Sequence, residues 1–128
     1  MLEGSSIDDS IINKVHNIAK NFKKILIFLD SNHTHEHVLA ELNAYANLTS
    51  VGSYIVVFDT VIDYLPENHL PNESNPSMSE ARTYTKGNSP MSAVREFLKD
   101  NENFKIISEI DSKLLISVAP EGYLKRIS

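Results

Sequence analysis

Two aspartates and a histidine are the residues whose types and spacing indicate chemistry in this chain. Asp30 ends the apolar run 24–29, Asp59 ends a second apolar run 53–58, and His33 follows Asp30 by three residues. If the two runs are neighbouring parallel strands, their axes lie about 4.8 Å apart and both aspartates reach the same sheet edge. Two ionised carboxylates that close repel each other unless a cation or a proton lies between them. Asp30 and Asp59 therefore predict a site for an oxygen-preferring divalent cation.

The segment between the two aspartates predicts the elements that position them. Residues 35–48 carry apolar side chains at helical spacing, which places Val38, Leu42, Tyr45 and Ala46 in the expected core. Short apolar runs on both sides of such a helix are typical of buried parallel strands joined by a crossover. Ligands of open α/β sheets bind at the carboxyl ends of the strands. The pattern predicts an α/β fold with its site at that edge.

The remaining periodic segments predict two more helices and a C-terminal hairpin. Residues 8–22 repeat apolar side chains at helical spacing, and Ser89-Pro90 is a favourable start for a helix over 90–100. Residues 104–110 and 113–119 read as two strands. Because only Asp111 and Ser112 separate them, we expect an antiparallel hairpin.

A long segment with little periodicity, residues 60–89, follows the second strand. Together with Pro90 it holds four of the five prolines. A stretch of this length inside a compact domain is usually a functional loop or a disordered one. Both readings stay open, although its position directly after Asp59 fits a lid. Tyr64 and Tyr84 are candidate contacts for a sugar or aromatic substrate, with ordinary loop packing as the alternative.

Bulk properties restrict the classes of partner and compartment. The chain has 128 residues, enough for a single domain, and a net charge of −5, which argues against nucleic acid as its main partner. It has no cysteine, so disulfides and thiolate metal sites are excluded. The first ten residues are too polar for a signal peptide, and no apolar run approaches a membrane span. We expect a cytoplasmic protein that does not associate with membranes.

Three histidines close together in the chain, His33, His35 and His37, raise the alternative of a zinc site. Zinc hydrolases usually space helical histidines by three or four residues, which this alternation does not match. We therefore expect His35 and His37 in the first helical turn, without a shared metal.

Several segments in the same order carry a resemblance to a known family: LDSNHTHEHVLAEL, GSYIVVFDT, GNSPMSAVREFL and PEGYLKR, with GSSID near the start. On these segments the chain resembles the cephalosporin hydroxylase family, and the resemblance extends over nearly the whole chain, from about Leu2 to Arg126. The resemblance implies a class I S-adenosylmethionine-dependent methyltransferase fold. It also implies a relation to metal-dependent O-methyltransferases that act on sugars of natural products and glycoconjugates.

The resemblance also implies roles for the residues at the predicted edge. It assigns Asp30 and Asp59 to a divalent metal, Mg²⁺, and His33 matches the general base of related sugar O-methyltransferases. A histidine that titrates near neutral pH suits the deprotonation of a metal-bound hydroxyl. The family pattern has a glutamate just before the second aspartate, where this chain has Phe58. Phenylalanine offers no lone pair, so this departure implies weaker metal binding or none.

The cofactor half of the family pattern is largely absent. This fold holds S-adenosylmethionine on a glycine-rich turn after its first strand, but the four glycines here, at 4, 52, 87 and 122, are all far apart. GSSID corresponds to the loop after the third strand, which places Gly4, Ser5 and Ser6 near the adenine. We therefore expect residues 1–128 to be one partial, N-terminally truncated domain. Its expected sheet is Rossmann-like and mostly parallel, with a C-terminal antiparallel hairpin.

Two function hypotheses follow. The first is a metal-dependent, S-adenosylmethionine-using O-methyltransferase-like protein that acts on a hydroxyl of a sugar or natural product, impaired as this fragment. The family name implies hydroxylation instead, and the sequence does not choose between the two reactions. The second is a non-catalytic domain that associates with itself, as a homo-oligomer, or with a partner chain through an exposed sheet edge. The missing glycine-rich turn and Phe58 favour the second hypothesis.

Overall fold

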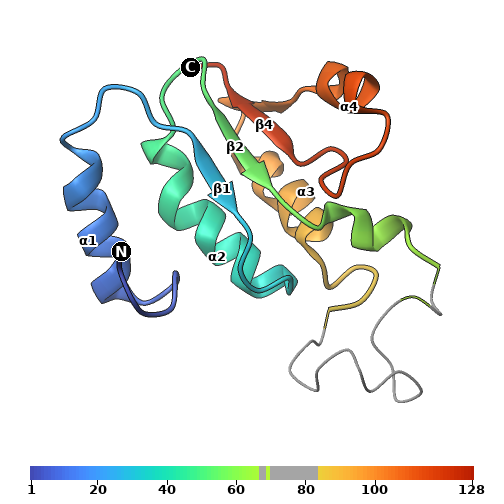
Figure 1. The fold of residues 1–128 in the computed structure, drawn as a ribbon, viewed down its shortest axis with the longest axis horizontal. Helices are drawn as coiled ribbons and strands as arrows, with labels where there is room; N and C mark the ends of the chain where they lie inside the picture. Colours follow the sequence, from blue (N-terminus) through green and yellow to red (C-terminus); the bar gives the residue numbers. More distant parts are fainter. Residues whose placement is uncertain (67–68, 70–83) are drawn as a thin grey trace.

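A mixed sheet of four strands forms the centre of the computed structural model, which describes residues 1–66, 69 and 84–128 (Figure 1). In spatial order the strands are β1 (Ile27–Leu29), β2 (Tyr54–Val57), β4 (Tyr123–Arg126) and β3 (Phe104–Ile106). β1 pairs with β2 in parallel, and β4 runs antiparallel to both of its neighbours. One pairing of the three is parallel, so the sheet is mixed rather than mostly parallel. β1 and β3 are its edges.

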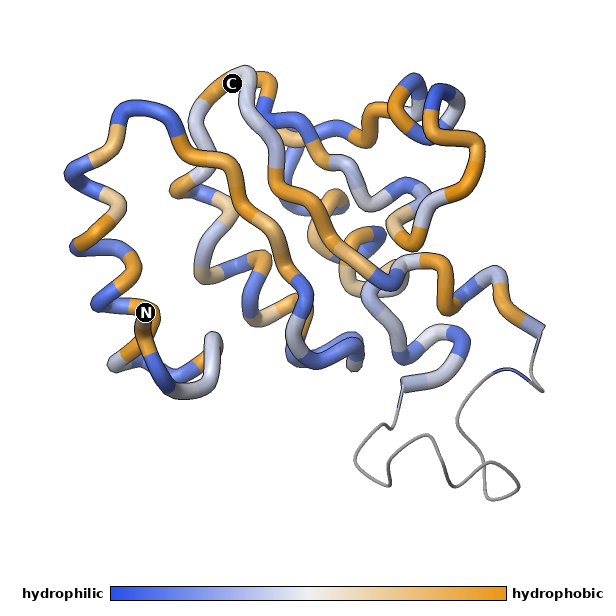
Figure 2. Tube along the Cα trace, in the orientation of Figure 1, coloured by the Kyte–Doolittle hydropathy of each residue, from blue (hydrophilic) through white to orange (hydrophobic). Residues whose placement is uncertain are grey.

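Helices supply the second layer. α2 (His35–Tyr45) and α3 (Pro90–Asp100) pack against each other behind the sheet, and α1 (Asp9–Ala19) lies beside α2, beyond the β1 edge (Figure 1). The apolar positions of β1 and β2 form a continuous stretch along the sheet (Figure 2). The core between the layers includes fully buried Leu42, Ile55, Val94 and Leu124.

The predicted strand–helix–strand unit is confirmed, with shorter strands than expected. β1 occupies the last three residues of the run 24–29, and β2 occupies the centre of the run 53–58. The helix over 35–48 divides into α2 and a 3-10 turn, η1 (Ala46–Leu48). The four residues expected in its core face are all buried. Because β1 and β2 are parallel, their carboxyl ends lie at one edge of the sheet.

α3 begins and ends at the predicted residues. Ser89 and Ser92 form a capping box, in which each hydroxyl accepts a hydrogen bond from the other residue's backbone N–H, at 3.3 and 3.1 Å. The Ser89 hydroxyl also donates to Asp63 Oδ1 at 2.5 Å. Asp63 lies in η2 (Thr60–Tyr64), which follows β2. This bond ties the chain just after β2 to the start of α3.

The predicted C-terminal hairpin is wrong, although β3 and β4 do pair antiparallel. The second strand is not 113–119: α4 (Ser108–Leu114) follows β3, and the partner strand is β4, beyond Gly122. Most of the apolar run after α4 stays at the surface, since Leu115 and Ile116 are 86% and 92% exposed, and only its last residue, Ala119, is buried. Leu124 of β4 takes the central core position instead, at 0% exposure.

Two further expectations concern the N-terminal helix and the long segment. α1 is shorter than the predicted helix over 8–22 and ends at Ala19. Residues 67–68 and 70–83, most of the predicted lid, lie outside the described residues, so the lid stays a prediction. Among the helices that the structure describes, none has the length and apolar character needed to cross a membrane.

Candidate metal centre at the carboxyl ends of β1 and β2

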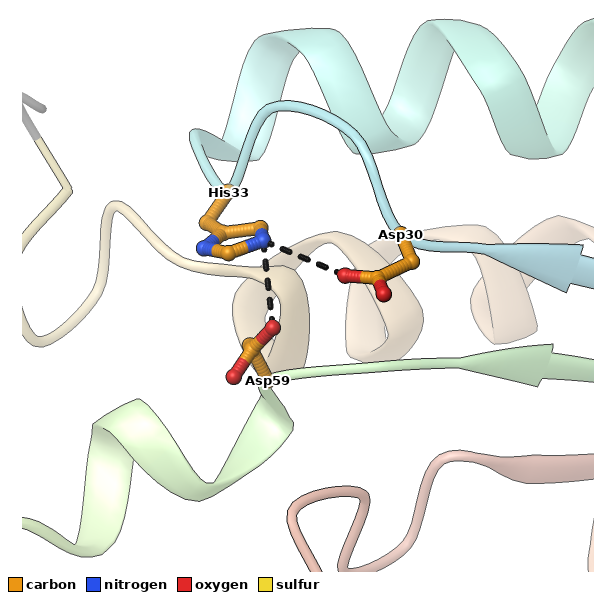
Figure 3. Close-up of side chains that lie close together, drawn as sticks. All are labelled: Asp30, His33 and Asp59. Carbon is orange, nitrogen blue, oxygen red and sulfur yellow. Dashed lines mark ion pairs between the residues drawn. The ribbon is translucent and has the colours of Figure 1, made fainter. Parts of the chain in front are cut away.

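The structure brings Asp30, His33 and Asp59 together. Asp30 follows β1 directly, Asp59 follows β2 after one residue, and His33 lies in the loop between β1 and α2. Their side chains point toward one another (Figure 3). His33 Nε2 lies 3.1 Å from Asp59 Oδ2 and 3.6 Å from Asp30 Oδ1. The two aspartates thus share one edge of the sheet, as the sequence predicts.

Local backbone geometry fixes both sides of this cluster. The Phe58 N–H donates to the Leu29 carbonyl at 3.0 Å, which holds the two strand ends side by side. Asp59 has a left-handed backbone, with φ 56° and ψ 20°, a conformation that aspartate tolerates better than most residues. On the other side, Asn32 Oδ1 accepts from the Thr34 N–H at 2.9 Å, and this Asx turn shapes the loop that carries His33.

The donor set is compatible with a shared divalent ion. One oxygen of each aspartate and one His33 nitrogen all lie within 4.8 Å of one another. Ligand atoms lie about 2.0–2.6 Å from a bound divalent ion, so atoms at these separations can reach the same ion. Carboxylate oxygens suit Mg²⁺, and an imidazole nitrogen adds suitability for transition metals. In the described residues this is the one group of three or more His, Cys, Asp or Glu that meets such a distance limit.

The cluster opens to solvent at one side. The side chain of Asp30 is 62% exposed, against 30% for Asp59 and 19% for His33. On the closed side the His33 ring lies 5.5 Å from the ring of Tyr84, which is buried. The cluster is therefore accessible from the Asp30 side, and Tyr84 packs behind the histidine.

Comparison with known proteins identifies the family. The family model described as rhamnosyl O-methyltransferase/CmcI matches residues 1–127. The chain belongs to this family. This agrees with the resemblance to cephalosporin hydroxylases that the sequence segments carry.

The family includes curated relatives from mycobacteria. The chain is 31% identical over 127 residues to proteins named rhamnosyl O-methyltransferase in Mycobacterium tuberculosis (strain ATCC 25618 / H37Rv) and Mycobacterium bovis (strain BCG / Pasteur 1173P2). The matched region is 98% of this chain and 46% of each relative. The chain thus spans just under half the length of these relatives. No solved structure matches the chain significantly.

Phe58 occupies the position where the family resemblance predicts a third carboxylate. Its ring lies 6.0 Å from the ring of Phe28 on β1, an apolar contact at the strand ends. It contributes no metal donor. In this chain the third donor near the two aspartates is the His33 imidazole.

The expected adenine residues of the family, Gly4, Ser5 and Ser6, precede α1. Ser6 Oγ lies 3.1 Å from His37 Nε2, and that nitrogen lies 3.1 Å from the hydroxyl of Ser31, the residue after Asp30. This loop is therefore linked by hydrogen-bonding groups to the β1 end of the cluster of Asp30, His33 and Asp59. Contact with adenine stays a prediction.

The three neighbouring histidines do not form one site. His35 Nδ1 lies 2.8 Å from Ser92 Oγ, and its Nε2 lies 3.1 Å from Glu96 Oε2. His37 faces Ser6 and Ser31 instead, so His33 alone joins the aspartates.

Sequence reasoning did not single out Glu41. This glutamate is 2% exposed, and its Oε1 accepts a hydrogen bond from Ser31 Oγ at 2.7 Å. A sequence signal existed, since a charged residue falls directly before Leu42 on the face that Val38, Leu42 and Tyr45 define as buried.

Proposed function

We propose that this chain forms the metal-binding part of an O-methyltransferase that acts on a hydroxyl group of a saccharide. The observation that carries the proposal is the convergence of Asp30, His33 and Asp59 at one sheet edge. Membership of the rhamnosyl O-methyltransferase/CmcI family supports the reaction and the substrate class.

In this proposal each residue has one role. Asp30 and Asp59 hold a divalent ion, Mg²⁺, whose chemistry is to lower the pKa of a bound hydroxyl. S-adenosylmethionine, when bound, supplies an electrophilic methyl group. His33 takes the proton from the saccharide hydroxyl. Gly4, Ser5 and Ser6 contribute the adenine side of the cofactor site.

The orientation of His33 selects the atom that takes the proton. Its Nε2 faces the two carboxylates, at 3.1 and 3.6 Å, and therefore lies beside the ion that they would hold. We assign the lone pair to Nε2, which takes the proton from the saccharide hydroxyl, and the hydrogen of the neutral imidazole to Nδ1.

A second candidate function is association without catalysis. Two observations favour it: Phe58 in place of a carboxylate, and an edge strand, β1, that pairs on one side only within the described part of the chain. An unpaired edge is a ready surface for another chain, including a second copy. The absence of cation binding together with a stable dimer in solution would favour this function over the first.

Calorimetric titration of Mg²⁺ and Mn²⁺ tests the metal role. At position 59 we choose asparagine rather than alanine, because asparagine tolerates the left-handed backbone there while it removes the negative charge. We expect Asp30→Ala and Asp59→Asn each to weaken binding by about tenfold or more, the loss of one charged ligand. Asp100→Asn, an exposed change at the end of α3, is the matched control. Equal cation affinity in the unmodified chain and the three variants would contradict the metal site.

Methyl transfer from labelled S-adenosylmethionine to methyl α-L-rhamnoside tests the reaction. His33→Gln keeps a polar side chain but removes the base, so we expect its rate to fall by about 10² or more. Its cation affinity should stay near that of the unmodified chain. A fall in cation affinity instead makes His33 a metal ligand, and unchanged transfer removes it from the mechanism.

A further inference from the structure

A groove runs along the side of β1 that faces away from β2. Its volume is about 610 Å³, with β1 as one wall and α1 and α2 as the others. Large apolar side chains around it remain exposed: Ile18 by 48%, Phe22 by 62%, Leu26 by 49% and Phe28 by 59%. Burial of such side chains is favourable, so this surface is suited to an apolar occupant.

The backbone of β1 offers hydrogen-bonding groups to the same groove. The Ile25 carbonyl accepts from the Ser50 N–H, and the Leu29 carbonyl accepts from the Phe58 N–H. Backbone groups of a strand point to alternate sides, so Ile25, Ile27 and Leu29 bond toward β2. The peptide groups of Leu26 and Phe28 therefore point into the groove, where the described residues place no further strand. An extended polypeptide would satisfy them.

A buried carboxylate completes the groove. Glu41 of α2 lines it, and Glu41 Oε2 is buried with no hydrogen-bond partner among the described residues. The other oxygen, Oε1, already accepts from Ser31. A buried carboxylate oxygen without a donor is costly, so the occupant is expected to bring one.

We propose that this groove receives an extended apolar strand from the part of the methyltransferase domain that the relatives have outside their match to this chain. The strand pairs with the Leu26 and Phe28 peptide groups and brings an N–H donor to Glu41. The curated relatives support this occupant, because the chain accounts for 46% of their length. Gly4 and Ser6 line the same groove, which brings the docked polypeptide beside the expected adenine site. The docking does not depend on the proposed metal chemistry.

The test mixes the full chain with a defined probe. The probe is the part of Mycobacterium tuberculosis rhamnosyl O-methyltransferase that lies outside its match to this chain. We expect a one-to-one complex in sedimentation velocity, with hydrogen exchange of the Leu26 and Phe28 amides slowed by about tenfold or more. Phe28→Lys should prevent the complex, because a charge on an edge strand opposes pairing. Glu41→Gln should weaken it by about tenfold, the loss of one charged hydrogen bond.

Controls separate docking from folding and from metal binding. Leu115→Lys, an equally drastic change in the exposed run after α4, should leave the complex unchanged. Phe28→Lys should keep the cation affinity of the unmodified chain, so loss of docking and loss of the metal site are distinguishable. Circular dichroism checks that the probe and each variant are folded. The proposal is overturned by no complex, by a complex that Phe28→Lys forms equally well, or by a dimer of the chain alone that protects the same amides.

Discussion

His33 is held between two acidic side chains by a few local features of the chain and by one strand pairing. Asp30 and the Asx turn at Asn32 are within three residues of it, and a single parallel pairing brings in Asp59. The sequence could predict this cluster because each aspartate directly follows an apolar run. It could not predict that the imidazole nitrogen would face both carboxylates, since that depends on the rotamer chosen in the folded loop.

Tyr45 provides a prediction at the residue scale. Its hydroxyl donates to the Ser6 carbonyl, and burial, with a smaller contribution from the charge of Glu41, raises the pKa of Tyr45 above its ordinary value of 10.0. The unfolded chain therefore loses this proton at a lower pH than the folded chain does. The stabilisation is complete below the unfolded pKa and is lost as the pH rises through the folded pKa.

The measurement is urea unfolding of the unmodified chain and Tyr45→Phe at about pH 8 and about pH 11, on either side of the ordinary tyrosine pKa. We expect the free energy of unfolding to fall further with pH in the unmodified chain than in Tyr45→Phe. At the lower pH Tyr45→Phe should be less stable by about 1 kcal/mol, the value of one hydrogen bond. Parallel pH dependence in the two proteins would contradict the shifted pKa.

At the scale of elements, prediction from sequence succeeded where periodicity was clear and failed where it was not. The helix over 90–100 and the unit from β1 to β2 have distinct apolar patterns and cap residues. The run 113–119 is mostly apolar without alternation, so its composition favoured a strand. In the structure it forms the end of α4 and a largely exposed segment. β4 has two charges in four residues, and its place in the sheet depends on pairing with β2 and β3, which are distant in sequence.

A prediction at the scale of elements concerns Gly122, just before β4. The Val57 N–H donates to the Gly122 carbonyl at 2.9 Å, and a Cβ at position 122 would lie 2.2 Å from the Val57 carbonyl oxygen. Gly122→Ala must therefore push β2 away from the start of β4, two residues before Asp59. We expect a loss of about 1–3 kcal/mol in unfolding free energy, as for other overpacked sites, together with weaker cation binding.

Gly52, in the turn before β2, provides a matched control. Gly52 has a φ of +82° but no atom within 4 Å of the position of a Cβ. Asparagine tolerates such a φ, so Gly52→Asn should change the unfolding free energy by well under about 1 kcal/mol. Equal losses in Gly122→Ala and Gly52→Asn would show that the contact with Val57 is not the cause.

At the scale of the whole molecule, the two helices at the ends of the helical layer differ in how they are attached. α3 buries Pro90, Met91, Ala93, Val94 and Phe97, whereas α1 buries only Ile11. Both helices have eleven residues, so length does not separate them. α1 is linked to α2 by His16 Nε2, 2.8 Å from the Ala44 carbonyl, and the loop before α1 is linked to α2 by the bond from Tyr45 to Ser6. The groove along β1 lies where a fuller contact with the sheet would be.

This difference predicts that α1 opens without unfolding the rest of the chain. Native-state hydrogen exchange should give α1 amides a lower opening free energy than α3 amides, by at least about 1.4 kcal/mol, or tenfold in exchange rate. The amides of α3 should open only with global unfolding, because that helix packs into the core. His16→Ala should lower the protection of α1 further and leave α3 unchanged.

Docking of the proposed strand should raise α1 protection toward that of α3, since it would fill the groove between α1 and β1. Equal opening free energies in the two helices of the chain alone would mean that α1 is already a full part of the cooperative core, and that the groove does not weaken its attachment.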